Sequence, residues 1–183
     1  RAFDKTETTN FEVGIKSRLM NNKVQLNATA FSMDTDGQHY ITQSPTGTGT
    51  IVGNATETAE RLGFDLNVVA KLTSNLTLNM SYFTVDDGSP DILSNAAARL
   101  TPDDAYTIGL SHNFPLGNGN IFSRVDYSYD GPYEYSSAPM LSPTWQAQLP
   151  AAYPELAEKQ DQEFLNYKIG WRNDSWELAY SVK

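Results

Sequence analysis

KLTSNLTLNMSYFTVDDG, residues 71–88, is the stretch that decides the fold, because its side chains alternate with a period of two from Leu76 onward. One set of positions carries Leu76, Leu78, Met80 and Tyr82, and the other carries Thr77, Asn79 and Ser81. Successive side chains of a β-strand point to opposite faces of the sheet. The pattern therefore predicts a strand with one apolar and one polar face.

Further segments repeat this alternation, and helical spacing is nearly absent. The alternating segments span residues 11–19, 23–30, 61–72, 106–114, 121–129, 165–172 and 176–182. A single short turn within residues 150–162 is the best helical candidate, and Pro154 limits its length. We therefore predict an all-β chain, an antiparallel up-and-down meander of about eight strands.

The connections between the predicted strands fall into two length classes. The short ones are MNN, TSN, PLGNGN and NDS, which follow the first, third, fifth and seventh strands and are rich in turn formers. The long ones cover residues 42–54, 86–103 and 130–161. Alternate connections of a meander lie at opposite ends of the sheet, so all short turns are expected at one end. This layout is typical of an outer-membrane β-barrel.

The two faces of the predicted strands suit a membrane barrel. The polar positions are mostly Asn, Thr, Ser and Gly with scattered Arg and Asp, as expected for a hydrated lumen, so Leu78 should face outward and Asn79 inward. Leu66 lies near the middle of its strand. Aromatic side chains end the apolar face, with Tyr82, Tyr106, Tyr127 and Tyr167 toward the loops and Phe114, Trp171 and Trp176 toward the turns. Ordinary cross-strand aromatic packing is the alternative interpretation.

Composition is compatible with this prediction and excludes other classes. The chain has 183 residues, of which 39% are hydrophobic, and no apolar run approaches the roughly 20 residues of a membrane helix. The mean hydropathy of -0.47 does not argue against a barrel, because barrel strands are only half apolar. A net charge of -9 argues against nucleic acid as a partner. The absence of cysteine excludes a disulfide scaffold and a thiolate metal site.

The order of the segments resembles the C-terminal half of the barrel of TonB-dependent receptors. TNFEVGIKSRLMNNKVQLNATAFSMD (residues 9–34) and RLGFDLNVVAKLTSNLTLNMSYFTVDD (residues 61–87) are similar to strand pairs of that family. SRVDYSYDGPY (residues 123–133) resembles its Arg-x-Asp-Tyr-Ser-Tyr strand. FLNYKIGWRNDSWELAYSVK (residues 164–183) is like the hairpin before its last strands. The resemblance covers nearly the whole chain.

The resemblance implies that residues 1–183 are a partial barrel domain without the plug and without the last strands, an arc of a larger transmembrane β-barrel. The implied function is TonB-dependent uptake of a scarce nutrient, such as an iron chelate (siderophore), a vitamin or an oligosaccharide, across the outer membrane of a Gram-negative bacterium. The implied partners are outer-membrane lipid, the plug of the same receptor and, through it, TonB. A complete eight-stranded barrel with a structural or adhesive role is the alternative, and a barrel-embedded lipid enzyme is a third class.

No catalytic, cofactor or metal motif is recognisable, so we predict neither an enzyme nor a metal site. His39 lies near Asp34 and Asp36, where a solvated loop edge is the simpler interpretation than a metal ligand. His112 follows Ser111, a pairing that suggests a hydrolase, but His112 falls on the apolar face near the turn end. We therefore interpret His112 as an interfacial residue.

Two groups of residues are candidates for contacts. Tyr133, Tyr135 and Trp145 lie in the long loop after the sixth strand, and such aromatics stack on sugars or flat chelates or pack the loop itself. Charged residues on the polar face bind a plug or guide a solute, and the resemblance favours the plug. These lumenal candidates are Arg61, Asp65, Arg124 and Asp126. The second and third strands also prolong their alternation at residues 31–42 and 55–60, which predicts a hairpin that projects outside.

Overall fold

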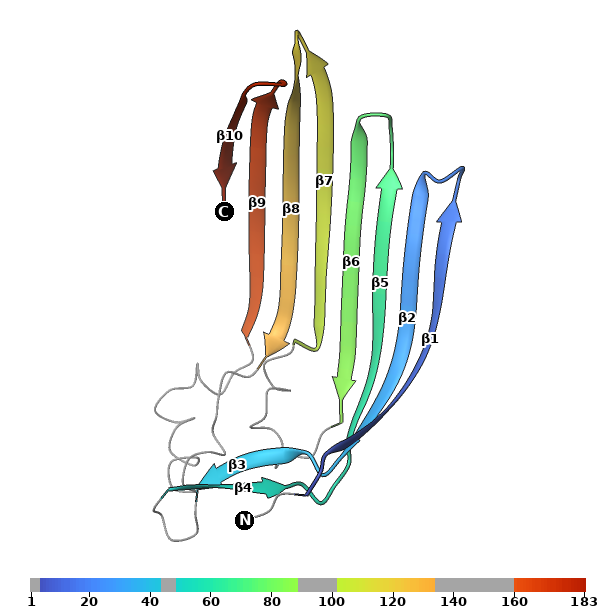
Figure 1. The fold of residues 1–183 in the computed structure, drawn as a ribbon, viewed down its shortest axis with the longest axis vertical. Coiled ribbons are helices and arrows are strands. Elements are labelled where there is room, and N and C mark those ends of the chain that lie inside the picture. The colour runs from blue at the N-terminus through green and yellow to red at the C-terminus, as the bar shows by residue number, and fades with distance from the viewer. Residues whose placement is uncertain (1–3, 44–48, 89–101, 134–159) are drawn as a thin grey trace.

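The computed structural model describes residues 4–43, 49–88, 102–133 and 160–183, and all of its regular elements are strands (Figure 1). The strands are β1 (Glu7–Leu19), β2 (Val24–Asp36), β3 (His39–Gln43), β4 (Thr50–Asn54), β5 (Ala59–Lys71), β6 (Leu76–Asp87), β7 (Asp104–Leu116), β8 (Gly119–Tyr133), β9 (Gln160–Arg172) and β10 (Glu177–Val182). Within the described ranges, no helix is long and apolar enough to span a membrane. A short helical turn was predicted within residues 150–162. Residues 150–159 lie outside the described part of the chain, and residues 160–162 belong to β9, which begins at Gln160.

Eight of the strands form one open antiparallel sheet, as predicted. Its order is β1-β2-β5-β6-β7-β8-β9-β10, so each strand pairs with the next one in the meander. In this sheet β1 and β10 lie at opposite edges and each pairs with one neighbour (Figure 1). The short turns lie at one end, here called the turn end, and the long connections lie at the other, the loop end.

Local chemistry fixes the tight turns. Met20, Asn21 and Asn22 between β1 and β2 all have positive φ angles, of 53°, 56° and 64°. Asparagine tolerates this left-handed region, whereas Met20 adopts it at a steric cost. Between β9 and β10, the side-chain oxygen of Asn173 accepts hydrogen bonds from the backbone N–H groups of Ser175 (2.9 Å) and Trp176 (2.8 Å). Such an Asx turn replaces backbone pairing where the strands reverse.

The strand register aligns apolar side chains into rows across one face of the sheet, which we call the apolar face. One row crosses all eight strands at Leu19, Val24, Ala70, Leu78, Leu110, Val125, Tyr167 and Val182. We call it the middle row, because it crosses β7, β8 and β9 near their middle, although it reaches β1 and β2 beside their turn. It contains no charged residue, and the only hydroxyl in it belongs to Tyr167. An apolar band one residue deep thus runs without interruption from one edge of the sheet to the other.

The predicted aromatic belts are correct in part. Tyr82, Tyr106 and Tyr129 form one row that lies toward the loop end of β7 and β8, and the Tyr106 ring packs against Tyr129 with a centroid separation of 5.1 Å. Tyr127, which was predicted in this belt, lies one apolar position closer to the middle of β8, and Tyr82 lies near the middle of β6. Phe114 and Trp171 share a row at the turn end through Ile121. The placement of Tyr167 at the loop end was wrong, because the register puts Tyr167 in the middle row.

Leu66 lies near the middle of its strand, as predicted, because β5 spans Ala59–Lys71. The register pairs Leu66 with Tyr82, which lies near the middle of β6. Leu78 lies closer to the turn end, two residues after β6 begins at Leu76. Leu66 is therefore the better position for a test of depth, since a charge costs most at the centre of a bilayer.

The opposite face, which we call the polar face, also carries phenylalanine. Phe31 lies over Gly63 of the neighbouring strand, and a Cβ atom built on Gly63 would overlap the Phe31 ring. Phe31 also stacks on Phe83, with a centroid separation of 6.4 Å and an interplanar angle of 20°. Glycine at position 63 therefore leaves the space that the Phe31 ring of β2 occupies, and a larger residue would have to displace this ring. The sequence prediction of a face made of small polar residues was incomplete here.

Beyond the sheet, β3 and β4 form a separate two-stranded hairpin that runs across the direction of the main strands (Figure 1). The sequence predicted a prolonged hairpin, but the second strand of the extension is Thr50–Asn54 and not residues 55–60. Gly37, with a φ angle of 64°, ends the continuous strand. The side-chain amide of Asn54 donates hydrogen bonds to the carbonyl oxygens of Gly37 (2.7 Å) and Asp4 (3.0 Å), which holds the base of the hairpin.

Neither face of the main sheet is covered by another layer of the described chain. The buried apolar residues in this part are Ala55, Ala59, Ala70 and Val85, of which only Ala70 points to the apolar face. Large side chains on the apolar face remain open: Leu62 is 64% exposed, Leu165 63% and Leu178 77%. An apolar surface of this extent marks contact with an apolar partner.

Candidate functional site

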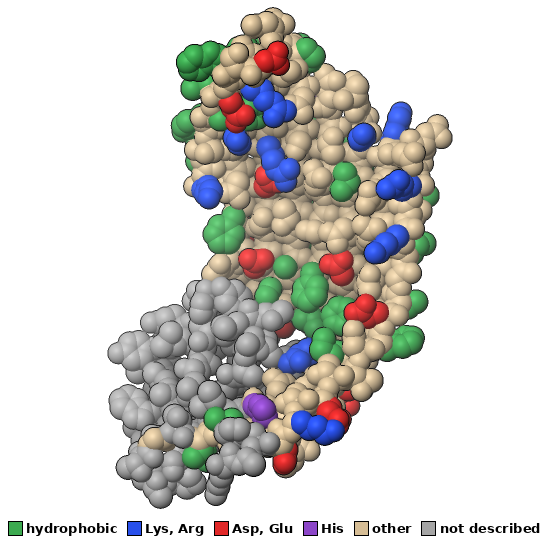
Figure 2. Space-filling view, in the orientation of Figure 1, with side chains coloured by type: hydrophobic (Ala, Val, Ile, Leu, Met, Phe, Trp, Pro, Cys, Tyr) green, Lys and Arg blue, Asp and Glu red, His purple; other side chains and the backbone are tan. Residues whose placement is uncertain are grey.

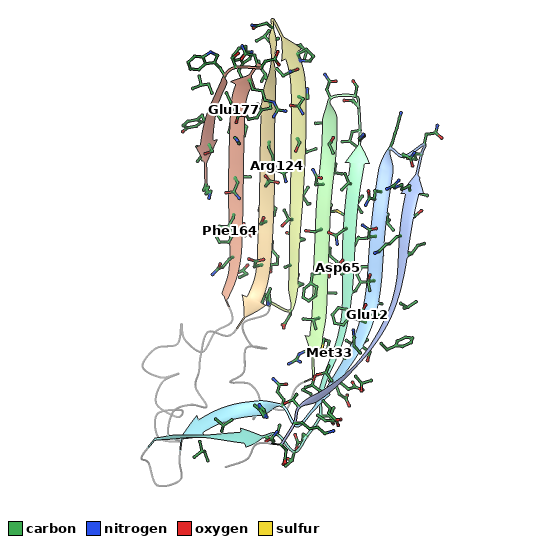
Figure 3. All side chains as sticks on the ribbon, in the orientation of Figure 1. Glu12, Met33, Asp65, Arg124, Phe164 and Glu177 are labelled. Atoms are coloured by element: carbon green, nitrogen blue, oxygen red, sulfur yellow. The ribbon has the colours of Figure 1, made fainter. Side chains whose placement is uncertain are left out.

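The polar face brings together two of the predicted lumenal residues. Arg124, labelled on β8 in Figure 3, lies two positions before Asp126 on the same strand. The two side chains form a bidentate ion pair, Nε to Oδ2 and Nη2 to Oδ1, both 2.6 Å. The guanidinium of Arg124 also donates to the hydroxyl of Ser111 on β7 (3.2 Å). A planar guanidinium suits this fork geometry, which fixes the direction of both charges.

The other two predicted residues do not join this pair. Asp65 lies on β5 and accepts a 2.6 Å hydrogen bond from the side-chain amide of Asn67. Arg61, also on β5, lies opposite Met33 toward the loop end. Two strands separate β5 from β8, so the four predicted residues form two groups on the polar face and not a single cluster.

Sequence reasoning missed a third group near the turn end. The Phe122 ring lies between two cations of β9, at 5.2 Å from Lys168 Nζ and 5.4 Å from the guanidinium carbon of Arg172. Lys168 also lies 3.7 Å from a carboxylate oxygen of Glu177. The alternation of side chains along each strand could have identified this group, since residues 122, 168 and 172 fall on the polar-face positions of their strands.

Charge is unevenly distributed over the polar face. Toward the turn end this face carries Lys16, Arg18, Lys71, Arg124, Lys168 and Arg172, accompanied by Asp126 and Glu177. Toward the loop end it carries Glu12, Asp65 and Asp130, accompanied by Arg61. Figure 2 shows the same separation, with most Lys and Arg side chains over the upper half of this face, where the turns lie. The face is thus polarised along the strands.

The aromatic loop candidates lie largely outside the described part of the chain. Tyr135 and Trp145 fall within residues 134–159. The backbone of Tyr133 ends β8, opposite Gln160, after an irregularity in the register that follows Asp130. The side chains of all three residues are outside what the structure describes, so their role stays a prediction.

The histidines occupy the positions that the simpler interpretations predict. A ring nitrogen of His39 (Nε2) lies 2.9 Å from the backbone oxygen of Asp4, at the base of the hairpin. His112 stacks on Phe114 on the apolar face, with a centroid separation of 6.3 Å. Ser111 points to the opposite face, where it meets Arg124, so a Ser111–His112 hydrolase pair is wrong. In the described ranges, no group of three or more His, Cys, Asp or Glu side chains is arranged to hold a metal ion.

An open antiparallel meander with sorted connections, an uncovered apolar face between aromatic rows and a charged opposite face defines an arc of a transmembrane β-barrel. The chain belongs to the TonB dependent receptor-like β-barrel family, whose model matches residues 1–182. This confirms the resemblance stated from the sequence. A comparison with curated proteins gives no significant match.

Solved structures of receptors and transporters share this fold. The chain is similar to the ferric yersiniabactin uptake receptor FyuA from Yersinia pestis, with a TM-score of 0.66 and 14% identity over 92% of this chain and 23% of that one. The ferric-catecholate import receptor Fiu from E. coli gives a TM-score of 0.63 and 16% identity over 94% of this chain and 22% of that one. The copper transporter OprC gives a TM-score of 0.62 and 11% identity over 97% of this chain and 25% of that one. The chain thus spans about a quarter of the length of these proteins, and at such identities the likeness concerns the fold.

Proposed function

We propose that the chain forms part of the wall of an outer-membrane receptor that takes up a scarce nutrient in a TonB-dependent manner. The middle row is the observation that carries this proposal. A row of apolar side chains across eight strands has no use in water, whereas it matches the hydrocarbon core of a bilayer. On this proposal the apolar face contacts lipid, and the polar face lines the lumen.

An iron chelate is the nutrient class that we favour over a vitamin or an oligosaccharide. Its support is the family match together with the similarity to FyuA, a ferric yersiniabactin uptake receptor, and to Fiu, a ferric-catecholate import receptor. The copper transporter OprC has the same fold, so the fold itself does not select the cargo. Tyr133, Tyr135 and Trp145 are the proposed contacts of the nutrient in the extracellular loop.

The proposed partners inside the barrel are the plug of the same receptor and, through it, TonB. Arg61, Asp65, Arg124 and Asp126 are the proposed lumenal contacts of the plug. The fixed direction of the Arg124–Asp126 pair supports such a role, because an oriented ion pair offers defined hydrogen-bond positions to a neighbouring domain. The alternative of a complete eight-stranded barrel would require β1 to pair with β10, and these strands lie at opposite edges of the sheet.

Spin labels at adjacent positions of β6 test the proposed faces. In the full-length receptor in lipid vesicles, a label at position 78 should be strongly relaxed by a lipid-soluble quencher, and a label at position 79 should be little affected. Equal quenching at the two positions, or none at 78, would show that the apolar face is packed against protein.

A further inference from the structure

Two adjoining hollows on the polar face form a basic surface at the turn ends of β1, β2 and β5. The first, of about 320 Å³, is lined by Lys16, Ser17, Arg18, Gln25 and Asn27. The second, of about 280 Å³, is lined by Arg18, Asn22, Lys23, Gln25, Val69 and Lys71. Arg18 and Gln25 belong to both. We call this surface the basic wall.

The basic wall holds four cations and no carboxylate among its described lining residues. Within the described ranges, none of Lys16, Arg18, Lys23 and Lys71 forms an ion pair. The cations at the same height on the far side of the sheet differ, since Arg124 pairs with Asp126 and Lys168 lies 3.7 Å from Glu177. The positive charge of the basic wall is therefore uncompensated by the sheet itself.

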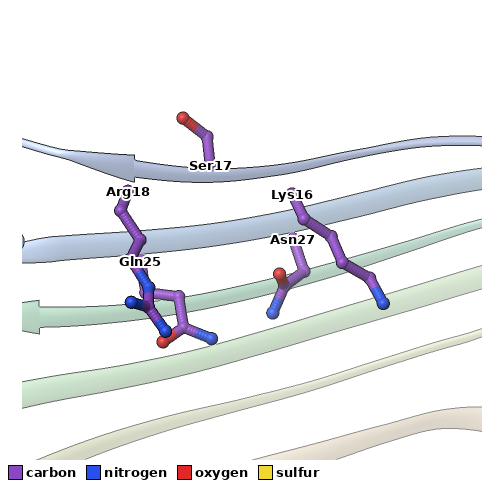
Figure 4. A pocket seen from close by; sticks show the side chains of 5 residues that line it. All are labelled: Lys16, Ser17, Arg18, Gln25 and Asn27. Atoms are coloured by element: carbon purple, nitrogen blue, oxygen red, sulfur yellow. The ribbon is translucent and has the colours of Figure 1, made fainter.

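The side chains of the basic wall point to one side of the sheet and combine two kinds of polar group. In Figure 4, Lys16, Arg18, Gln25 and Asn27 project to the same side, whereas Ser17 projects to the other. The ammonium and guanidinium groups only donate hydrogen bonds, but the amides of Gln25 and Asn27 donate and accept. A fully deprotonated oxyanion has no hydrogen to donate to the amide oxygens of Gln25 and Asn27. The backbone N–H groups of a polypeptide can donate to them.

The size of the basic wall also favours a polypeptide. Its cations come from β1, from the β1–β2 turn and from β5, and at roughly 4.8 Å per strand β1 and β5 are about 10 Å apart. A single phosphate or carboxylate group would fill only part of the two hollows. Acidic residues at alternate positions of an extended segment are about 7 Å apart, so that one segment can reach both hollows.

We propose that the basic wall docks an acidic polypeptide segment of the plug, with two carboxylates at alternate positions, one in each hollow. The inference rests on the proposed function, because a domain must lie inside the barrel for the segment to reach this face. It adds a site that the Arg124–Asp126 pair does not provide, on the other side of the sheet. Charge complementarity of this kind fixes the orientation of a docked domain more than it adds affinity.

Site-specific photo-crosslinking in the full-length receptor, in its native outer membrane, tests the proposal. Benzoylphenylalanine replaces Gln25, and as a control it replaces Asn166, which lies in the same row on β9. Position 25 should crosslink to a plug peptide that carries two acidic residues at alternate positions, identified by mass spectrometry. A crosslink from position 25 to lipid, to a barrel strand next to β1 or to a second copy of the chain would overturn the proposal.

Charge-neutralising variants give the second measurement. Arg18→Gln combined with Lys71→Gln should lower the yield of the position 25 crosslink by roughly tenfold, because both hollows lose a cation. The matched double variant Lys168→Gln with Arg172→Gln should change it less than about twofold. The heat-shift of the barrel on a gel verifies that each variant is assembled, and an assembled Arg18/Lys71 variant with an unchanged yield would overturn the proposal.

The acidic segment and the plug itself are contradicted by different outcomes. A crosslink from position 25 to a neutral or basic plug peptide would overturn the acidic segment while leaving the proposed receptor function intact. If neither position 25 nor position 166 reaches a plug peptide, the proposed plug inside this barrel is itself wrong.

Discussion

Placing an arginine at position 66 should measure directly what covers the apolar face. Leu66 lies near the middle of β5, seven residues from Ala59 at the loop end and five from Lys71 at the turn end. At ~3.4 Å per residue and a tilt near 40°, these two ends are roughly 18 Å and roughly 13 Å away along the membrane normal. Leu66 is thus near the expected bilayer midplane, where Arg costs about 2–4 kcal/mol in a transmembrane barrel.

Two other substitutions provide the comparison for Leu66→Arg. Leu78→Arg lies two residues from Leu76, where β6 begins at the turn end, so it lies near the membrane interface and should cost about 0–1 kcal/mol. Asn79→Arg points to the polar face and should cost less than about 1 kcal/mol, because water and the nearby Asp126 row solvate the new charge. The predicted order of cost is therefore Leu66→Arg far above Leu78→Arg and Asn79→Arg.

Equilibrium unfolding of the full-length receptor in lipid vesicles, with urea as denaturant, gives the three free energies. Burial against protein would penalise Leu66→Arg and Leu78→Arg alike, because the cost of a charge in a protein core does not follow depth in a bilayer. Equal costs at the two leucines would therefore refute the lipid assignment of the apolar face, even if both values were large.

Three further predictions concern interactions within the sheet. Gly63→Ala should destabilise the barrel by about 1–3 kcal/mol through overlap with the Phe31 ring, and Phe31→Leu should recover part of this loss in urea unfolding; no loss would contradict the close approach. A double-mutant cycle to alanine at Phe31 and Phe83 should give a coupling energy of about 0.5–1.5 kcal/mol, and a value of zero would exclude the stack. Asn173→Ala should cost about 1 kcal/mol by removing the acceptor of the turn, whereas Asn173→Asp keeps that acceptor and should cost less in the same assay.

The sequence predicted the strands and their faces because both follow from local periodicity. Period two assigns each side chain to a face without knowledge of its neighbours, so the pairing of Arg124 with Asp126 on one face was foreseeable. The short turns also fix the register within each hairpin. The strand pairs β1–β2, β5–β6, β7–β8 and β9–β10 are therefore the predictable part of the sheet.

The register between neighbouring hairpins could not be predicted from the sequence, because a long connection does not fix which residues of the next strand pair with the strand before it. The basic wall depends on this register, as it combines Arg18 of β1 with Lys71 of β5. The error at Tyr167 has another origin: β9 begins at Gln160, five residues before the alternating segment that starts at Leu165, so Tyr167 lies near the middle of its strand. Phe31 was missed for a different reason: it lies on the polar face, where apolar side chains break the pattern that defines that face.

Within the described residues, the hairpin β3–β4 pairs only with itself, and it joins the main sheet at Gly37 and at the Asn54 amide, beyond the last paired residues of β2 and β5. Insertions, deletions and substitutions between these two points therefore leave the backbone hydrogen bonds of the main sheet in place. The segment can change in length and composition more freely than the strands that carry it.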